Sequence, residues 1–577
     1  MRRCCAITLA ALAAAAAGRA AGNPECSDGN HRSFDVIVYG STPGGIAAAI
    51  AAANSAARPS VLLLSPTPHI GGMMSGGLGH TDKGNVSVIG GLARTFFRKV
   101  CEHYGSKDPD GCFEFEPHVA ETILESMLAS SPAVRLAGDD CEAASFDRAV
   151  SGRGTGLRGA WLSDQAREPA AGAAAAPQQS LRSVTTAGGS TFAASVFVDA
   201  SYEGDLLVGS GADAVWGREG RAAFNESMAG RLPMPEPYAN PENQFGVFVN
   251  ATAPGGGVLP LVWPGSVAAV GDGDNRTMAY TFRLCMTDDP SNTVPLPDPP
   301  GGYDPARFEL LRRYIRALPA AAANSSASYW MPSSIPGRKL DVNNRGAVST
   351  DFILGSWTYP TATPAERRAI AAAHADYILG LLRFLRTDPA VPQAVRSEIS
   401  RWGLAKDEFA DSPIVPHWPY QLYVRECVRL RGAHVFSQAD RTTDLGKADS
   451  VAVGSYNIDV HNGQRFMGSE TGRLVNEGNF DRWGPTKPDA KGSFDIPFRA
   501  LVPRDEPSQP SNVLSPVCAS ATHVGYGALR LEPQYMAMGQ AAGVAAAMAW
   551  AGGVAVQRVD VQALQAELVA AGQIIHR

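Results

Sequence analysis

A run of apolar residues, a glycine turn and an alanine-rich stretch follow one another near the start of the chain. Residues 34–40, FDVIVYG, have the pattern of a buried strand, and residues 44–57 have the composition of a helix. Residues 60–65, SVLLLS, predict a second buried strand. Apolar strands joined through a helix by short links are typical of a right-handed parallel crossover in an α/β domain.

The same kinds of pattern return further along the chain. A glycine-rich loop at residues 69–82 precedes amphipathic helix patterns around residues 90–105 and 116–130. Residues 191–211 again predict a strand that enters a glycine-punctuated helix. We interpret the low-complexity tract at residues 167–180 as a surface excursion without chemistry.

The middle of the chain has a different composition. It is rich in Pro, Asn, Trp and Tyr, and its clear helical pattern covers residues 364–388, with a proline in the first turn. Glycine and alanine patterning returns from residue 511, and Asp560 is placed to cap a last helix. The two ends of the chain therefore resemble each other in pattern more than either resembles the middle.

Chain length and charge narrow the architecture. A chain of 577 residues is too long for one ordinary core, and its net charge of −6 comes without a basic stripe that would favour nucleic acid. We predict an α/β fold with a Rossmann-like cofactor domain built from both chain ends, residues 33–230 and 501–577. An inserted α+β substrate domain would occupy residues 231–500.

The N-terminus has the pattern of a targeting segment. Two arginines precede an apolar stretch and small residues, which predicts a secretory signal peptide at residues 1–22; an organellar transit peptide is the alternative. We expect no membrane span in the rest of the chain. Five N-glycosylation sequons favour the secretory route and a glycoprotein. They begin at Asn85, Asn225, Asn250, Asn275 and Asn324.

The cysteines do not form a recognisable framework. Two of the nine lie in the leader, and the other seven are an odd number spread over a long chain. Cys101 and Cys112 flank a Gly/Asp/Pro turn and are the first choice for a disulfide. Without a C-x-x-C motif or a close Cys/His cluster, the sequence suggests neither a dithiol redox site nor a metal.

The first glycine turn nearly matches the dinucleotide-binding pattern G-x-G-x-x-G. Gly40 and Gly45 supply the tight turn and the close helix–strand packing, but Thr42 stands where the middle glycine approaches the pyrophosphate. Gly44 adds slack, and the Thr42 hydroxyl can donate to a phosphate oxygen. The turn therefore predicts a pyrophosphate at the helix N-terminus, with a turn that binds nothing as the alternative.

The end of the second strand departs from the usual pattern as well. Ser65 stands where an acidic residue commonly holds the ribose hydroxyls. A serine is a weaker anchor, and it leaves no carboxylate to repel a 2′-phosphate. This turn alone does not distinguish FAD, NAD and NADP.

Longer motifs carry a family resemblance. The segments "YGSTPGGIAAAIAAA", "HIGGMMSGGLGHTD", "VFVDASYEGDLLVGSGA" and "SATHVGYGALRLEPQYMAMGQAAGVAA", with "GRKLDVNN" and "WPYQLYVRE" in the middle, span nearly residues 34–550. Together they resemble the FAD-dependent oxidoreductases of the glutathione-reductase-type flavoprotein superfamily. The nearest branch is the secreted, xanthan-lyase-like one.

The resemblance implies FAD as cofactor and assigns residues to it. It places a phosphate turn, a ribose contact, a loop under the cofactor, a strand-end motif and a C-terminal helix opening toward the flavin. A second glycine turn for NAD(P)H is absent from the sequence, so an external electron acceptor or dioxygen is expected. The residues are, in that order, Gly40, Thr42, Gly44, Gly45; Ser65; Gly71, Gly72, Met73; Asp199, Ala200, Ser201; and Gly539, Gln540, Gly543.

His523 is the first candidate for catalysis. Its imidazole can take a hydroxyl proton while a hydride leaves for the flavin, and a structural histidine is the alternative. His80 and Asp82 are expected to shape a turn, whereas Arg530 and Glu532 can pair with each other. Polar residues of the middle region either line a substrate pocket or form buried scaffolding. They are Asn343, Asn344, Tyr423, Arg425 and Glu426.

These observations predict a secreted flavin-dependent dehydrogenase or oxidase. Its small-molecule substrate would be polar or carbohydrate-like and would react at a CH–OH group. A lyase or isomerase that retains FAD without redox chemistry is one alternative. A non-catalytic secreted protein on a flavoprotein fold is the other.

Overall fold

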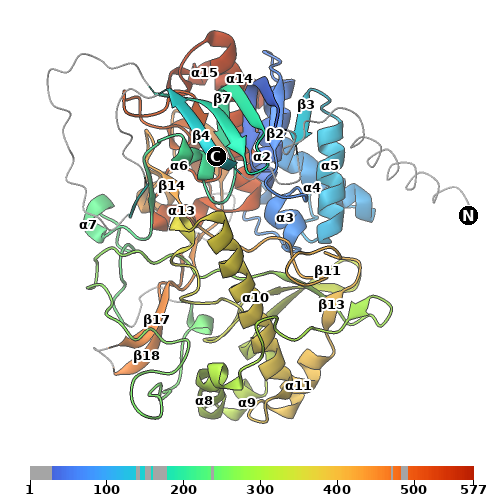
Figure 1. The fold of residues 1–577 in the computed structure, drawn as a ribbon, viewed down its shortest axis with the longest axis vertical. Coiled ribbons are helices and arrows are strands. Elements are labelled where there is room, and N and C mark those ends of the chain that lie inside the picture. Colours follow the sequence, from blue (N-terminus) through green and yellow to red (C-terminus); the bar gives the residue numbers. More distant parts are fainter. Residues whose placement is uncertain are drawn as a thin grey trace, which may run out of the picture.

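The computed structural model describes residues 29–137, 143–149, 157–159, 179–234, 240–468, 472–482 and 492–577. The expected leader and most of the tract at residues 167–180 lie outside these ranges. Figure 1 shows the two ends of the chain, in blue and red, gathered in one half of the molecule, while green and yellow segments of the middle form the other half.

The main sheet has the strand order β3-β2-β1-β7-β6-β4, and β21 pairs with β7 beside β6. Pairing is parallel between β3 and β2, β2 and β1, β1 and β7, and β7 and β21. Strand β6 pairs antiparallel with both β7 and β4. A parallel sheet in a mixed α/β fold is therefore confirmed. The strands are β1 (His31–Tyr39), β2 (Val61–Leu64), β3 (Val134–Ala137), β4 (Ala143–Ala149), β6 (Ser180–Thr186), β7 (Thr191–Asp199) and β21 (Val513–Leu514).

Two small-residue helices pack against each other beside this sheet. Helix α2 (Pro43–Asn54) makes the expected crossover between β1 and β2, and α14 (Glu532–Gly552) lies across it. A Cβ added at Gly539 would lie 2.0 Å from the Gly44 carbonyl oxygen, and one at Gly543 would lie 2.1 Å from that of Ala48. The alanine and glycine content of both helices is what permits this close approach.

Helices α4 (Gly91–Tyr104) and α5 (Pro117–Ala129) follow the glycine-rich loop, as predicted. The expected disulfide between Cys101 and Cys112 is present. Cys285, Cys427 and Cys518 are buried free thiols, and the remaining two cysteines beyond the leader lie outside the described residues.

The middle region is built around a second sheet, of order β10-β13-β9-β12-β11. Helix α10 (Pro364–Thr387) runs lengthwise through this half of the molecule (Figure 1), and Thr363 and Glu366 form a capping box at its start. The strands are β9 (Leu284–Thr287), β10 (Thr293–Val294), β11 (Met331–Ile335), β12 (Lys339–Asn343) and β13 (Gly403–Ala405).

Short elements complete the described fold. The structure also contains the three-stranded sheet β14-β8-β5 and three two-stranded ladders, β15-β20, β16-β19 and β17-β18. These strands are β5 (Leu157–Gly159), β8 (Ala214–Trp216), β14 (Arg429–Leu430), β15 (Ser450–Gly454), β16 (Ile458–Val460), β17 (Gln464–Gly468), β18 (Arg473–Glu477), β19 (Phe480–Arg482) and β20 (Phe494–Pro497). The remaining α-helices are α3 (Gly72–Gly76), α6 (Asp205–Gly209), α7 (Arg221–Phe224), α8 (Glu309–Ala317), α9 (Ala320–Ala323), α11 (Gln393–Ser400), α12 (Gln438–Thr442), α13 (His523–Leu529) and α15 (Val561–Ala570).

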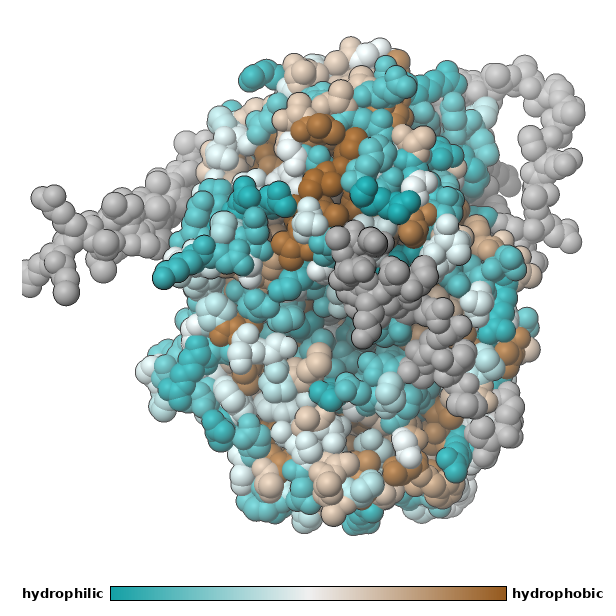
Figure 2. Space-filling view, turned by 180° about the vertical axis from the view of Figure 1, so that it is seen from behind, coloured by the Kyte–Doolittle hydropathy of each residue, from teal (hydrophilic) through white to brown (hydrophobic). Residues whose placement is uncertain are grey.

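The surface is mainly polar on the face that Figure 2 presents, and hydrophobic residues gather in its upper half.

Asp560 caps α15 through bonds from the backbone N–H groups of Gln562 and Ala563, as expected. Among the residues that the structure describes, no helix has both the length and the apolar character that crossing a membrane requires.

Candidate functional site

The carboxyl edge of the parallel sheet brings together segments that are far apart in the sequence. Gly40 follows β1, Ser65 follows β2 and Asp199 ends β7. The hydroxyl oxygens of Ser41 and Ser65 lie 2.6 Å apart, and the Thr42 hydroxyl donates to the Ala200 carbonyl at 2.7 Å. The predicted turn, strand end and strand-end motif therefore meet at one place.

The turn between β1 and α2 requires glycine at both of its ends. Gly40 has a φ of 97°, and a Cβ there would lie 2.6 Å from the Ser201 amide nitrogen. A Cβ on Gly45 would lie 1.9 Å from the Gly40 carbonyl oxygen. Gly44 instead lies under α14, with its Cβ position 2.9 Å from the Tyr535 carbonyl oxygen. The roles expected of Gly40 and Gly45 match this geometry.

Thr42 has a different role from the expected phosphate donor. As the N-cap of α2, its hydroxyl accepts a bond from the Gly45 amide at 3.1 Å and donates its single proton to the Ala200 carbonyl. In this structure the hydroxyl is therefore used within the protein, and its expected contact with a phosphate stays a prediction. Within the described chain, the backbone N–H groups of Thr42 and Gly44 have no protein acceptor. These amides remain available to an anion at the helix N-terminus.

Asp199 and Ser65 are both fully buried and bonded within the protein. One oxygen of Asp199 accepts from the amide and hydroxyl of Ser201 at 3.0 and 2.7 Å, and the other accepts from the Leu207 amide at 2.6 Å. Burial raises the pKa of the Asp199 carboxyl to about 7 despite these bonds. The Ser65 hydroxyl donates to the Thr67 carbonyl at 2.6 Å. Both residues shape the carboxyl edge of the sheet.

The loop at Gly71, Gly72 and Met73 lies against this edge. The Gly71 amide donates to the Ser41 carbonyl at 2.7 Å, and the Met73 amide donates to the Tyr202 hydroxyl at 3.0 Å. That hydroxyl donates in turn to a Glu532 carboxyl oxygen at 2.7 Å. The loop is thus linked to the start of α14 by way of Tyr202.

Glu532 is a site residue whose position the sequence reasoning missed. It is the first residue of α14, and burial raises the pKa of its carboxyl to about 8. The second carboxyl oxygen is buried without a hydrogen-bond partner. Since burial favours the protonated form of this carboxyl, it can donate one bond to a bound group. The sequence signal was a glutamate directly before a proline, which is typical of a first helical turn.

The C-terminal helix does not open where it was expected to. Helix α14 begins at Glu532, so Gly539 and Gly543 lie in its interior against α2, and the expectation that they face the flavin at a helix N-terminus is wrong. The Gln540 side chain accepts a bond from the Leu92 amide at 2.8 Å and so supports the start of α4. Small residues in α14 serve helix packing, which a sequence pattern does not distinguish from cofactor contact.

His523 begins helix α13 in a buried, charged environment. Its Nδ1 lies 2.9 Å from a Glu426 oxygen, and its backbone amide donates to Glu219 at 2.8 Å. Arg429 donates to the same Glu426 oxygen at 3.1 Å. Burial opposes ionisation of Glu426, but His523 and Arg429 outweigh it and hold the pKa of this carboxyl below its usual value. Thr522 donates at 2.7 Å to Glu226, whose pKa burial raises to about 7.

Arg530 does not pair with Glu532 as the sequence suggested. Its guanidinium is buried and contacts Asp459 at 3.0 Å, with the Tyr423 hydroxyl at 3.4 Å. The expected ion pair fails because Glu532 turns toward Tyr202 while Arg530 turns toward the middle region.

The end of the glycine-rich loop is fixed by the middle region. The Tyr456 hydroxyl donates to Asp82 at 2.8 Å, and the His80 amide donates to Asp341 at 2.8 Å. The Asp341 carboxylate also pairs with Arg283 through two bonds of 2.7 Å. His80 and Asp82 are therefore positioned as parts of a structured turn.

The remaining polar residues of the middle region form buried pairs. Arg425 contacts Asp351 at 2.8 Å and stacks over the Tyr423 ring, with its guanidinium carbon 4.8 Å from the ring centre. His461 contacts the other Asp351 oxygen at 2.8 Å. The Asn343 side chain accepts from the Asn344 amide at 2.8 Å.

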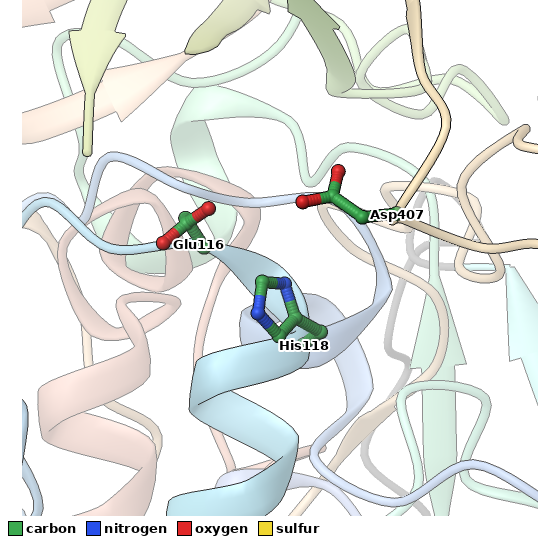
Figure 3. Close-up of side chains that lie close together, drawn as sticks. All are labelled: Glu116, His118 and Asp407. Carbon is green, nitrogen blue, oxygen red and sulfur yellow. The ribbon is translucent and has the colours of Figure 1, made fainter. Parts of the chain in front are cut away.

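A separate cluster joins α5 to the middle region. Figure 3 shows the Glu116, His118 and Asp407 side chains pointing toward one another, and their ligand atoms lie within 4.8 Å. The buried Lys339 ammonium lies 2.7 Å from Glu116 and 2.9 Å from Asp407. It also lies 2.7 Å from Glu408. The lysine thus supplies the positive charge that these carboxylates require.

Comparison with known proteins identifies the family. A model of the family described as FAD dependent oxidoreductase matches residues 35–568. The chain belongs to this family, whose cofactor is FAD. No curated protein matches the chain.

Similar solved structures overlap only part of the chain. Aquifex aeolicus GidA is 14% identical, with 29% of this chain and 25% of that chain covered and a TM-score of 0.18. T. acidophilum thioredoxin reductase is 13% identical, with 29% and 35% covered and a TM-score of 0.17. Cyclohexanone monooxygenase from Rhodococcus sp. Phi1 bound to NADP+ is 16% identical, with 30% and 26% covered and a TM-score of 0.18. The chain thus spans roughly a quarter to a third of these relatives' lengths.

Proposed function

We propose that this member of the FAD dependent oxidoreductase family is a dehydrogenase or oxidase acting on a CH–OH group of a small polar or carbohydrate-like substrate. The chemistry that bound FAD would supply is acceptance of a hydride from the substrate carbon. The chain itself must hold the cofactor, orient the alcohol and take up the hydroxyl proton. The electron acceptor would be an external molecule or dioxygen.

The residues at the carboxyl edge of the main sheet fit FAD. The free amides of Thr42 and Gly44 would hold the pyrophosphate at the start of α2. Gly71, Gly72 and Met73 would form the wall of the site, with Ser65 beside the ribose. The buried Glu532 oxygen without a partner is the strongest sign that a polar ligand completes this site.

The observation that carries the proposed chemistry is the pairing of His523 with Glu426. In the neutral imidazole, Nδ1–H donates to the Glu426 carboxylate, so Nε2 carries the lone pair. Within the described chain, Nε2 has no hydrogen-bond partner. A carboxylate that orients an imidazole in this way prepares it to act as a general base. His523 would take the proton and Glu426 would position it.

Anaerobic mixing with a panel of sugars and polyols tests the function. Purified protein should carry FAD, and one compound of the panel should bleach its absorption by reducing the flavin. An FAD-bearing protein that no alcohol reduces would overturn the alcohol oxidation and turn attention to lyase or isomerase chemistry.

The roles of His523 and Glu426 are separable by substitution. We expect His523→Asn to slow flavin reduction by about 10²–10⁴-fold with FAD still bound. Glu426→Gln should lower the rate less, because the imidazole stays in place and only the carboxylate that orients it is lost. His103→Asn, at an exposed position, is the control. Equal rates in the His523 variant and the control would contradict the proposed base.

We also propose that the protein enters the secretory pathway, with a signal peptide at residues 1–22. A disulfide such as that between Cys101 and Cys112 suits an oxidising compartment. Asn225, Asn250 and Asn324 are exposed, whereas the Asn85 amide nitrogen is buried and leaves no room for a glycan. Mass spectrometry after expression in a eukaryotic secretory host should find glycans at exposed sequons and none at Asn85. Intracellular retention without glycans would contradict the proposal.

Two further assignments complete the proposal. We place the FAD-binding domain at residues 33–230 and 501–577 and the substrate domain at residues 231–500. The pairing of β21 with β7 and the packing of α14 on α2 support a cofactor domain built from both chain ends. The buried ion pairs of the middle region support a separate role for that segment in substrate binding.

A further inference from the structure

We propose that the substrate carries a protonated amino group, and that a cluster of hydrogen-bond acceptors in front of Arg530 binds it. The acceptor cluster consists of Asp82, Tyr456, Asn457, Asp459 and Asp481. This inference rests on the proposed function, because it places substrate recognition beside the FAD site. The substrate group that we propose for this cluster is an ammonium, in contrast to a neutral or an acidic group.

Direct contacts join parts of the acceptor cluster. The Tyr456 hydroxyl donates to Asp82 at 2.8 Å, and the Asn457 side-chain amide donates to Asp481. Asp459 contacts Arg530 at 3.0 Å. Asp459 and Asp82 both act electrostatically on Asp481, so the three carboxylates lie close enough to influence one another.

The acceptor cluster has more negative than positive charge. Three carboxylates face the buried guanidinium of Arg530. His461 Nε2 also lies 3.9 Å from Asp459, but burial lowers the pKa of this imidazole and so favours its neutral form. Arg283 and Arg425 are each paired with another aspartate, Asp341 and Asp351, and so do not balance this excess. Consistent with that, partial desolvation and the neighbouring Asp459 raise the pKa of the Asp481 carboxyl to about 6.

An unpartnered amide oxygen points to a ligand at this place. The Asn457 side chain is 2% exposed, and its oxygen has no hydrogen-bond partner while its nitrogen is used on Asp481. The unmet need is therefore for a donor. A ligand that donates several hydrogen bonds and carries positive charge satisfies both the amide oxygen and the carboxylates.

The position of the acceptor cluster suits a substrate. Asp82 ends the glycine-rich loop that contains Gly71, and Arg530 stands two residues before Glu532, so short stretches of chain link both to the proposed FAD site. Asp481 is exposed and the Asp459 side chain is 23% exposed, which leaves a way in from solvent. A carboxylate substrate would meet repulsion here.

A metal ion is a poorer occupant than an ammonium group. Among the described residues, the group whose ligand atoms lie within 4.8 Å of one another is Glu116, His118 and Asp407, and it does not include these aspartates. An ammonium ion with three directed donors can bridge more widely spaced acceptors. A protonated amine on the substrate is therefore the better match.

Three sugars of one ring framework test the inference on the FAD-bearing enzyme. Glucosamine, glucose and glucuronate present an ammonium, a neutral and an acidic group. Binding is measured by calorimetry and by perturbation of the oxidised flavin spectrum. We expect glucosamine to bind at least about tenfold more tightly than glucose, and glucuronate to bind weakest, because hydrogen bonds to charged groups are the stronger ones. Equal binding of glucosamine and glucose, or no binding of glucosamine, would overturn the inference.

Variants localise the preference. Asp459→Asn and Asp481→Asn should each reduce the preference for glucosamine over glucose severalfold. Asp449→Asn, which removes a carboxylate paired with the exposed Arg499, should leave it unchanged. An unchanged preference in both cluster variants would show that the ammonium binds elsewhere.

The assay separates this inference from the proposed function. It uses equilibrium binding to oxidised enzyme and needs no turnover. Failure of flavin reduction with every alcohol would refute the oxidation while leaving the amine preference intact. Loss of the preference with normal flavin reduction would refute the ammonium site alone.

Discussion

The two chain ends and the middle region are held together by different forces. At the ends, glycines have no side chain to separate neighbouring backbone segments, so these segments pack closely. Gly45 lies against Gly40 in this way, and Gly539 lies against Gly44. In the middle, buried ions meet their counter-ions, as in Arg283 with Asp341 and Arg425 with Asp351. The glycine turn at the start of α2 leaves amides free for a phosphate, whereas the ion pairs of the middle place charged side chains in its interior. The difference suggests cofactor binding at the ends and substrate binding in the middle.

The most severe break at the ends is Gly45→Val. Its side chain would begin 1.9 Å from the Gly40 carbonyl oxygen, so α2 must separate from the β1 turn. We expect complete loss of FAD from purified protein, read from the absorption spectrum, and a lower Tm. Gly246→Val, where an added Cβ meets nothing within 4 Å, is the matched control. Normal FAD content in Gly45→Val would remove the turn from the site.

The substitution Lys339→Met tests the ion pairs between α5 and the middle region. It leaves Glu116, Asp407 and Glu408 without their buried ammonium. Removing one partner of a buried ion pair costs about 3–5 kcal/mol, so urea unfolding should show a loss of that size. Lys83→Met, at a partly exposed lysine, should change stability by less than about 1 kcal/mol. A chelator that lowers the Tm of the wild-type protein would indicate a metal in place of the lysine's role.

Two glycines of one helix give a smaller contrast. Gly539→Ala drives a methyl group into Gly44 and should destabilise the protein by about 1–3 kcal/mol. Gly552→Ala meets only Val554 side-chain atoms at 3.6 Å or more, and should stabilise α14 by up to about 1 kcal/mol. Thermal unfolding of both variants measures the difference. Similar Tm values would show that α14 does not need its close contact with α2.

The smallest expected effect concerns pH and Glu532. Its folded-state pKa of about 8 lies above the usual 4.5, so its contribution to stability is complete below the lower value and is lost as pH rises toward the higher one. Glu532→Gln stays neutral and should flatten that part of the pH–stability curve. Glu102→Gln at an exposed position should not. An unflattened curve in the Glu532 variant would mean that this carboxyl is ionised in the folded protein.

The sequence pattern predicted the helices and strands whose formation depends on residues close together in the chain. The β1 strand, the α2 crossover, β2, α4, α5 and α10 all lie where apolar periodicity and prolines indicated. The sequence could not predict the hydrogen bond that the Thr42 hydroxyl donates, because its acceptor, the Ala200 carbonyl, is 158 residues away. Gly539 and Gly543 misled for a related reason, since a small residue can serve a cofactor or a neighbouring helix.

The middle region was harder to predict because its partners are distant and their pairing has no period. Arg530 forms an ion pair with Asp459, 71 residues away in the sequence, and not with the nearby Glu532. Glu426 was recognised as polar and buried, but its contact with His523, 97 residues away, came only from the fold. Such pairs depend on which surfaces the packing of the core brings together.

The division of labour between the two regions is tested most directly by flavin absorption before and after anaerobic addition of a substrate that reduces the wild-type enzyme. We expect Gly45→Val to have no flavin band to bleach. Asp459→Asn should keep the band and bleach far more slowly than wild type at the same substrate concentration. Loss of FAD from Asp459→Asn, or bleaching of that variant at the wild-type rate, would contradict the separation of cofactor and substrate sites.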